Sequence, residues 1–126
     1  MKKAEVKFIN ITKKFNETVA VDNISCNFEA GTLTTLLGPS GCGKTTSLRL
    51  IAGLERATGG KILIDDEDVT IQPATDRDVS MVFQSYALFP HMSVIENVSY
   101  GLKMINVKKE EYIEKSLETL KLVNLE

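Results

Sequence analysis

The residues with the clearest chemistry form one short glycine-rich stretch, Gly38-Pro39-Ser40-Gly41-Cys42-Gly43-Lys44-Thr45-Thr46. This stretch fits the pattern G-x-x-x-x-G-K-[ST], which is typical of a phosphate-binding loop. Its three glycines let the main chain turn tightly, so that successive N–H groups point toward one anion. A helix that starts near Lys44 would add its free N–H groups and the positive end of its dipole. The stretch therefore predicts a polyphosphate site.

Three side chains of the loop complete this chemistry. The Lys44 ammonium can reach the outer two phosphates as a point charge, and the Thr45 hydroxyl can coordinate Mg²⁺. Thr46 can add a hydroxyl to the inner phosphate. The alternative is a glycine-rich turn with a chance lysine, and the flanking elements decide against it.

Those flanking elements are a strand and a helix. The segment Leu33–Leu37, with three leucines and two threonines, predicts a buried strand, and residues 47–52 predict a helix that ends at Gly53. A strand before the loop and a helix after it are the context that the motif requires.

The first third of the chain is predicted to be mostly β. Val6, Phe8 and Ile11 alternate roughly as in a strand, and Asn16-Glu17 is a plausible hairpin turn. Residues 18–28 predict the return strand, with an irregularity near Asp22-Asn23.

Two more strands are expected after the phosphate-loop helix. Residues 61–64 predict a short strand that ends in the acidic run 65–68, and residues 78–83 predict a strand buried on both faces. Residues 72–77 between them predict a loop.

The C-terminal third predicts two helices. Ser93 and Glu96 form a capping box that starts a helix running to about Lys103. Residues 106–123 predict a second helix with an i,i+4 pair, Glu111 and Lys115, on its solvated side. Its apolar face is predicted to carry Ile113, Leu117 and Leu120.

Composition narrows the class of protein. The chain has 126 residues, which suffices for one domain with a core, and its net charge is −2. This charge gives no basic field for nucleic acid, and the apolar runs are too short to span a bilayer. No signal peptide is expected, and Cys26 and Cys42 fit a reducing compartment without a disulfide.

Three separated segments resemble the ATP-binding subunits of ABC transporters. They are "ITKKFNETVAVDNISCNFEAGTLTTLL", the loop "GPSGCGKTT" and "MVFQSYALFPHMSVIENVSYGLK". The last two look most like the importer group that serves sugars, polyamines, ferric iron or sulfate. The resemblance implies an α/β P-loop NTPase fold with an N-terminal antiparallel β part. It also implies two parts, with residues 1–84 in the ATP-binding core and residues 85–126 in the Gln-loop and the start of a helical subdomain.

The resemblance implies ATP and Mg²⁺ as cofactors and adds two site residues. Phe15 takes the position of the aromatic that stacks on adenine, where the family usually has Tyr or Trp; the alternative is a core aromatic at the hairpin end. Gln84 matches the glutamine that reaches Mg²⁺ and the attacking water; the alternative is a surface glutamine. Lys44 and Gln84 are thus the expected catalytic residues, and Thr45 and Gln84 the expected metal ligands.

The resemblance also implies partners. Ser85–Ser93 matches the surface that receives a cytoplasmic helix of a membrane-embedded permease, and its apolar Leu88, Phe89 and Met92 either bind a partner or pack under the following helices. A second copy is expected to complete a head-to-tail dimer at the cytoplasmic face of the membrane. No nucleic-acid partner is expected, and the isolated His91 predicts neither a metal site nor the family's catalytic histidine.

Two parts of the family's catalytic set have no match in the sequence. Residues 62–67, a strand followed by acids, resemble the family's hairpin after the phosphate-loop helix rather than its Mg²⁺-binding acidic motif. No LSGGQ-like signature occurs either. Phosphoryl transfer depends on several groups acting together, so hydrolysis by this chain alone is expected to be absent or near background. A sheet with an uncovered apolar edge is expected to make the chain weakly stable and prone to association.

The expected function is therefore the ATP-binding part of an ABC importer subunit, an ATPase in its full-length form. The alternative is a non-transport ABC ATPase of DNA repair or translation. A GTPase would need an Asn-Lys-x-Asp guanine reader, which the sequence lacks. No acceptor site supports a kinase.

Overall fold

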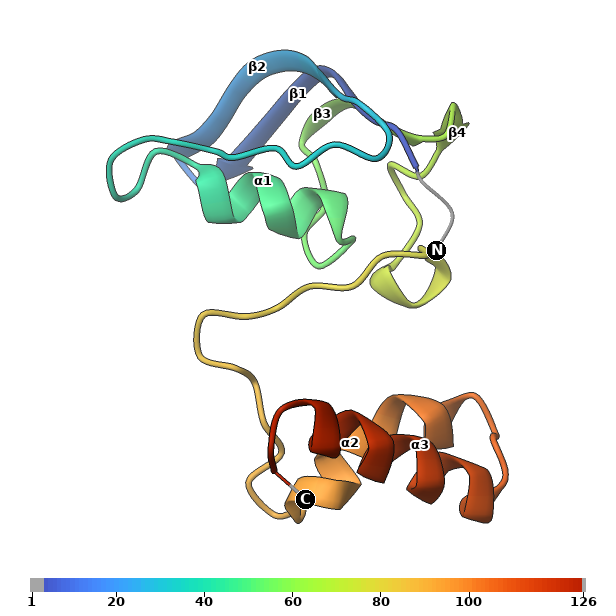
Figure 1. Ribbon diagram of the computed structural model, residues 1–126. Coiled ribbons are helices and arrows are strands. Elements are labelled where there is room, and N and C mark those ends of the chain that lie inside the picture. Colours follow the sequence, from blue (N-terminus) through green and yellow to red (C-terminus); the bar gives the residue numbers. More distant parts are fainter. Residues whose placement is uncertain (1–3, 126) are drawn as a thin grey trace. The chain divides into compact units, whose positions relative to one another are not determined.

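A long β-hairpin opens the chain in the computed structural model, which describes residues 4–125. Strands β1 (Val6–Phe15) and β2 (Thr18–Phe28) pair antiparallel, and Phe15 lies opposite Thr18. Asn16 takes a positive φ of 51° in the turn between them, a conformation that asparagine tolerates. The predicted hairpin and its turn are confirmed (Figure 1).

The hairpin is irregular in its middle. The register shifts between the pairs Phe8–Cys26 and Ile11–Ile24, and shifts again before Lys13. Asn23 has a φ of 46°, and its N–H donates to the Thr12 hydroxyl at 3.1 Å. The irregularity predicted near Asp22-Asn23 is therefore confirmed as a bulged stretch.

Two further strands extend the sheet on the other side of β1. Strand β3 (Gly59–Ile64) pairs antiparallel with β1, and the short β4 (Glu67–Asp68) pairs with β3, which gives the order β2-β1-β3-β4. Asp65 and Asp66 form the turn between β3 and β4 with φ values of 49° and 64°. The first half of the acidic run is thus a hairpin turn, as expected, and the second half forms β4.

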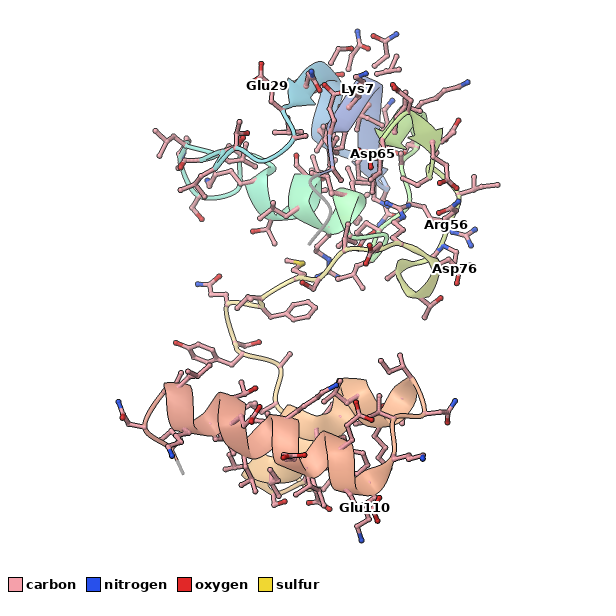
Figure 2. The ribbon with its side chains drawn as sticks, turned by 45° about the vertical axis from the view of Figure 1, so that its right-hand side comes forward. Lys7, Glu29, Arg56, Asp65, Asp76 and Glu110 are labelled. Atoms are coloured by element: carbon pink, nitrogen blue, oxygen red, sulfur yellow. The ribbon has the colours of Figure 1, made fainter. Side chains whose placement is uncertain are left out.

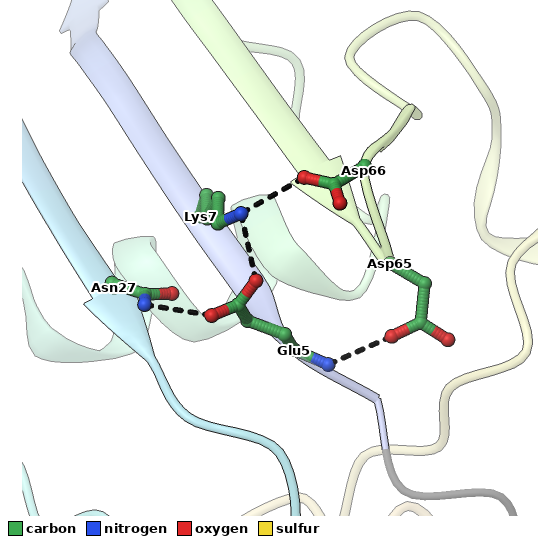
Figure 3. Close-up of polar contacts among 5 residues, drawn as sticks. All are labelled: Glu5, Lys7, Asn27, Asp65 and Asp66. Carbon is green, nitrogen blue, oxygen red and sulfur yellow. Dashed lines mark hydrogen bonds and ion pairs between the residues drawn. The ribbon is translucent and has the colours of Figure 1, made fainter.

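Charged side chains tie this turn to the start of β1. The Glu5 N–H donates to the Asp65 carboxylate at 2.9 Å, and the Lys7 ammonium lies 2.8 Å from Asp66 and 2.7 Å from Glu5 (Figures 2 and 3). The Asn27 amide on β2 donates to Glu5 at 2.8 Å. This network joins three strands at one end of the sheet.

One helix covers the sheet and forms the core with it. Helix α1 (Lys44–Ile51) lies along the sheet (Figure 1). Its Leu50 packs among apolar side chains of the strands and of the turn after β4. The buried cluster consists of Phe8, Ile11, Val21, Leu50, Ile62 and Val69. Gly53, with a φ of 73°, follows the helix end as predicted.

Two predicted strands do not form. The segments 33–37 and 78–83 are irregular, and the side chains of Leu33, Leu37 and Val82 are 96%, 89% and 90% exposed. A parallel strand needs main-chain partners on its edges, and no strand of residues 4–125 pairs with either segment. Apolar sequence alone is therefore insufficient to make a strand here.

The chain divides into two compact units, Met1–Met81 and Val82–Glu126. The second unit is a helical hairpin of α2 (Val94–Met104) and α3 (Lys109–Leu122). The predicted capping box is confirmed: the Ser93 N–H donates to Glu96 at 2.7 Å, and the Glu96 N–H donates to the Ser93 hydroxyl at 3.4 Å. The expected division at residue 84 stays a prediction.

The buried face of α3 matches the predicted one at Leu120 and in part at Ile113, but not at Leu117. Ser116 and Leu120 are 1% and 7% exposed, whereas Leu117 is 50% exposed. The Ser116 hydroxyl donates to the Tyr112 carbonyl at 2.6 Å, so a polar side chain can be buried where α3 meets α2. Glu110, in the first turn of α3, points away from the helix pair (Figure 2). Among residues 4–125, no helix combines the length and apolar character that crossing a bilayer requires.

Candidate functional site

The phosphate-loop motif forms a turn that leads directly into helix α1. Gly41 and Gly43 have φ values of 78° and 94°, which L-residues with side chains rarely adopt. The Cys42 N–H donates to the Pro39 carbonyl at 3.4 Å and closes the turn. The loop and the helix of the predicted arrangement are present, although the strand before them is not.

Gly43 is required at the start of the helix for a second reason. It is the N-cap residue, and a Cβ at this position would overlap the Ala20 carbonyl oxygen on β2. Because Gly43 has no side chain to cap the helix, the N–H groups at the start of α1 are left for an external acceptor. An anion at this end would also meet the positive end of the helix dipole.

Lys44 points back into its own loop. Its ammonium donates to the carbonyls of Gly38 and Pro39 at 2.7 Å each, and lies 3.3 Å from the Cys42 sulfur. These contacts hold the positive charge at the mouth of the turn. A bound phosphate would replace carbonyl oxygens with a charged acceptor, which forms the stronger hydrogen bond.

The two threonines of the motif occupy the first turn of α1. Thr45 is exposed, and its hydroxyl makes no hydrogen bond within residues 4–125, whereas Thr46 is half-buried. A free hydroxyl next to a phosphate-binding loop suits a Mg²⁺ ion, which prefers one or two protein oxygens together with phosphate oxygens. The donor set therefore fits a polyphosphate together with Mg²⁺.

Phe15 lies at the end of β1 and is 43% exposed, outside the core cluster. The exposed ring does not fit the alternative of a core aromatic. The Lys13 ammonium lies 4.5 Å from the ring centroid, 3.0 Å from the Glu55 carboxylate and 2.9 Å from the Arg56 carbonyl. Lys13 thus joins the aromatic ring to the segment after α1, a contact that the strand pattern alone did not indicate.

Gln84 lies in the second unit, in an exposed turn where Tyr86 and Ala87 have φ values of 62° and 51°. Such values are uncommon for residues other than glycine. Gln84 is exposed in this turn, as both the expected catalytic role and the alternative of a surface glutamine require. Its joint action with Lys44 stays a prediction.

In the apolar segment after Gln84, some side chains pack against α2 and others are exposed. Phe89 packs on Tyr100 with ring centroids 4.6 Å apart, whereas Tyr86 and Leu88 are 78% and 69% exposed. The Asn97 amide on α2 holds the segment by donating to the Phe89 and Met92 carbonyls at 3.2 and 3.1 Å. The segment borders an apolar groove of about 520 Å³, lined also by Val94, Val98, Leu120, Val123 and Leu125.

The sequence is similar to a known protein family and to curated bacterial proteins. A family profile described as "ABC transporter" matches residues 21–126. The Fe(3+) ions import ATP-binding protein FbpC of Brucella abortus is 62% identical over 120 residues, which is 95% of this chain and 34% of that protein. The corresponding protein of Agrobacterium fabrum is 58% identical over 125 residues, 99% of this chain and 35% of that protein. The chain thus spans about a third of the length of these curated relatives.

Solved structures give the same result for the fold. A dimeric ATP-binding cassette in a post-hydrolysis state, bound to ADP and Pi, matches with a TM-score of 0.77 and 31% identity; the match covers 96% of this chain and 58% of that one. A dimeric bacterial ABC transporter cassette matches with a TM-score of 0.79 and 30% identity, again over 96% and 58% of the two chains.

Proposed function

The chain belongs to the ABC transporter family of ATP-binding proteins, and on that premise we propose that it is the MgATP-binding part of an importer's ATPase subunit. The solved cassettes confirm the predicted fold class, an α/β P-loop ATPase whose N-terminal part is antiparallel β. The observation that carries the proposal is the phosphate loop, whose lysine, positive-φ glycines and open helix N-terminus converge at one point.

In the proposed complex the triphosphate lies at the N-terminus of α1. The main-chain N–H groups of the loop donate to its oxygens, and Lys44 leaves the Gly38 and Pro39 carbonyls to neutralise the outer phosphates. Thr45 would hold Mg²⁺, and Gln84 is the second residue that we propose for binding the metal and orienting the attacking water. Phe15 stacks on the base.

The transported solute is proposed from the relatives. Both curated relatives described above are named as Fe(3+) import proteins, which favours an iron importer within the group expected from the sequence. The same names favour an importer over the alternative of DNA repair or translation. Solute choice itself belongs to other subunits in this proposal.

The proposed partners are a second copy of the subunit and a membrane permease. The dimeric cassettes support pairing with a second copy, for which we propose the head-to-tail arrangement, and the import names support the permease. We assign permease docking to the region Ser85–Ser93, because its exposed Leu88 borders the apolar groove of the helical hairpin. The subunit would then lie peripherally on the cytoplasmic face of the membrane.

Calorimetric titration with MgATP tests the nucleotide site. Lys44→Ala removes the only side-chain ammonium of the loop and is expected to weaken binding by at least about tenfold, since charge-assisted hydrogen bonds to phosphate are lost. Lys61→Ala is the control, because Lys61 is an exposed lysine on β3 whose side chain is 65% accessible. Equal affinities of wild type and Lys44→Ala would remove the assignment.

A further inference from the structure

A buried arginine lies at the opposite end of the phosphate-loop helix. Arg77 is 6% exposed, in a segment where the sequence predicts a loop. Its guanidinium donates from Nη1 to the Leu50 and Ile51 carbonyls at 2.7 and 2.9 Å. It also donates from Nη2 to the Val69 carbonyl at 2.6 Å and from Nε to the Gln72 carbonyl at 3.0 Å.

These contacts join the C-terminus of α1 to the segment after β4. The last carbonyls of a helix lack partners within the helix, and the dipole there favours a positive charge. Within residues 4–125 the guanidinium hydrogen bonds all go to main-chain carbonyl oxygens. Because the acceptors are fixed main-chain atoms and the donors form a rigid fork, the position of the helix end is closely defined.

Gly53 makes the close approach possible. It follows the helix with a φ of 73°, and a Cβ there would lie 2.8 Å from both the Arg77 Nε and the Ala74 nitrogen. At the other end of α1, Gly43 contacts Ala20 of β2 in the same close manner. The helix is therefore fixed at both of its ends, by Arg77 at one and by Gly43 at the other.

We propose that Arg77 is a positioning residue for the phosphate loop: it holds the C-terminus of α1 and thereby sets the angle at which the helix N-terminus meets the phosphates. The helix has 8 residues, which corresponds to about 12 Å. A displacement at its C-terminus therefore tilts the N–H groups at Gly43–Thr46. Hydrogen bonds weaken steeply with angle, so a small tilt lowers nucleotide affinity. This inference rests on the nucleotide site proposed above.

Arg77→Lys tests the inference, because lysine keeps the charge but cannot reach four carbonyls from one ammonium. The amide resonances of Gly41, Gly43 and Lys44 are expected to shift in the variant without any nucleotide. The dissociation constant for MgATP is expected to rise about fivefold to tenfold, as binding amides move out of line. Binding is measured well below the unfolding midpoint of each variant.

Two controls separate positioning from general loss of stability. Arg56→Lys makes the same chemical change at an exposed arginine after α1. Ile62→Val weakens the same core but removes none of the four Arg77 hydrogen bonds. Both are expected to leave the loop resonances and the nucleotide affinity unchanged. Unshifted loop resonances in Arg77→Lys, or equal effects in Ile62→Val, would overturn the inference. The resonance measurement needs no ligand, so failure of wild type to bind MgATP would count against the proposed function alone.

Discussion

Phe15 and Lys44 are proposed to meet opposite ends of the nucleotide, the base and the phosphates. The Phe15 ring is partly exposed and has a cation, Lys13, 4.5 Å from its centroid. Lys44 is held by carbonyl oxygens that a phosphate can replace. One residue thus offers an aromatic face and the other a positive charge.

Replacing the aromatic ring tests the base contact. Phe15→Ala is expected to weaken MgATP binding by about tenfold or more, because stacking on a base contributes ~1–3 kcal/mol. Phe15→Tyr, which keeps the ring, should bind as wild type does. Calorimetry of the three proteins makes the comparison, and an unchanged affinity of Phe15→Ala would exclude stacking at this position.

The capping box of α2 carries a testable pH dependence. The Ser93 hydroxyl, followed by the Ser93 N–H, donates to the Glu96 carboxylate and lowers its pKa from the ordinary value of 4.5. Since the folded-state pKa is the lower one, the stabilisation is complete above pH 4.5 and is lost as the pH falls through the folded value.

Glu96→Gln should therefore lower helix stability near neutral pH and remove this part of the acid sensitivity. Thermal unfolding followed by circular dichroism at several pH values measures the difference from wild type. Glu110→Gln is the control, because Glu110 also lies in the first turn of a helix but its carboxylate makes no hydrogen bond within residues 4–125. Parallel acid profiles of wild type and Glu96→Gln would contradict the expectation.

The sequence predicted correctly those turns and helix ends that depend on contacts between residues close in the chain. The turn at Asn16-Glu17, the capping box at Ser93 and the glycine after α1 all depend on neighbours within a few residues, and all are confirmed. The strand at residues 33–37 was predicted wrongly because its formation depends on distant main-chain partners. Arg77 was overlooked because its partners are carbonyls, which leave no side-chain signature in the sequence.

The unpaired segment 33–37 exposes apolar side chains, which are expected to promote self-association. Leu33 and Leu37 are almost fully exposed, and contiguous exposed apolar residues favour association. Leu37→Lys should reduce binding of a hydrophobic dye and concentration-dependent self-association in sedimentation velocity. Leu122→Lys, at another exposed leucine on α3, is the control with the smaller expected effect. Equal dye binding by wild type and Leu37→Lys would show that this segment is not the surface responsible.

At the scale of the whole molecule, stability rests on a small core in the first unit. Ile11, Leu50 and Ile62 are fully buried there, and they join β1, α1 and β3. Ile62→Ala is expected to cost about 2–5 kcal/mol, through lost apolar burial and the cavity that remains. Whole domains are stable by only ~5–15 kcal/mol, so this change is expected to unfold much of the unit.

Urea denaturation of wild type, Ile62→Ala and Ile62→Val makes the measurement. Ile62→Val removes a single methyl group and should cost only about 0.5–1.5 kcal/mol. A free energy of unfolding for Ile62→Ala within that smaller range would show that the sheet, and not this core, supplies most of the stability.

The close contact between Gly43 and Ala20 connects the region that would bind the phosphates to the hairpin that carries Phe15. Ala20 lies near the start of β2, close along the hairpin to Phe15, and Gly43 begins the helix that meets the phosphates. The hairpin of β1 and β2 would thus connect the proposed base site at Phe15 to the proposed phosphate site at Gly43. Binding of inorganic triphosphate, which has no base, to the phosphate loop would then lower deuterium uptake at the hairpin tip. The tip would respond although it makes no contact with the triphosphate.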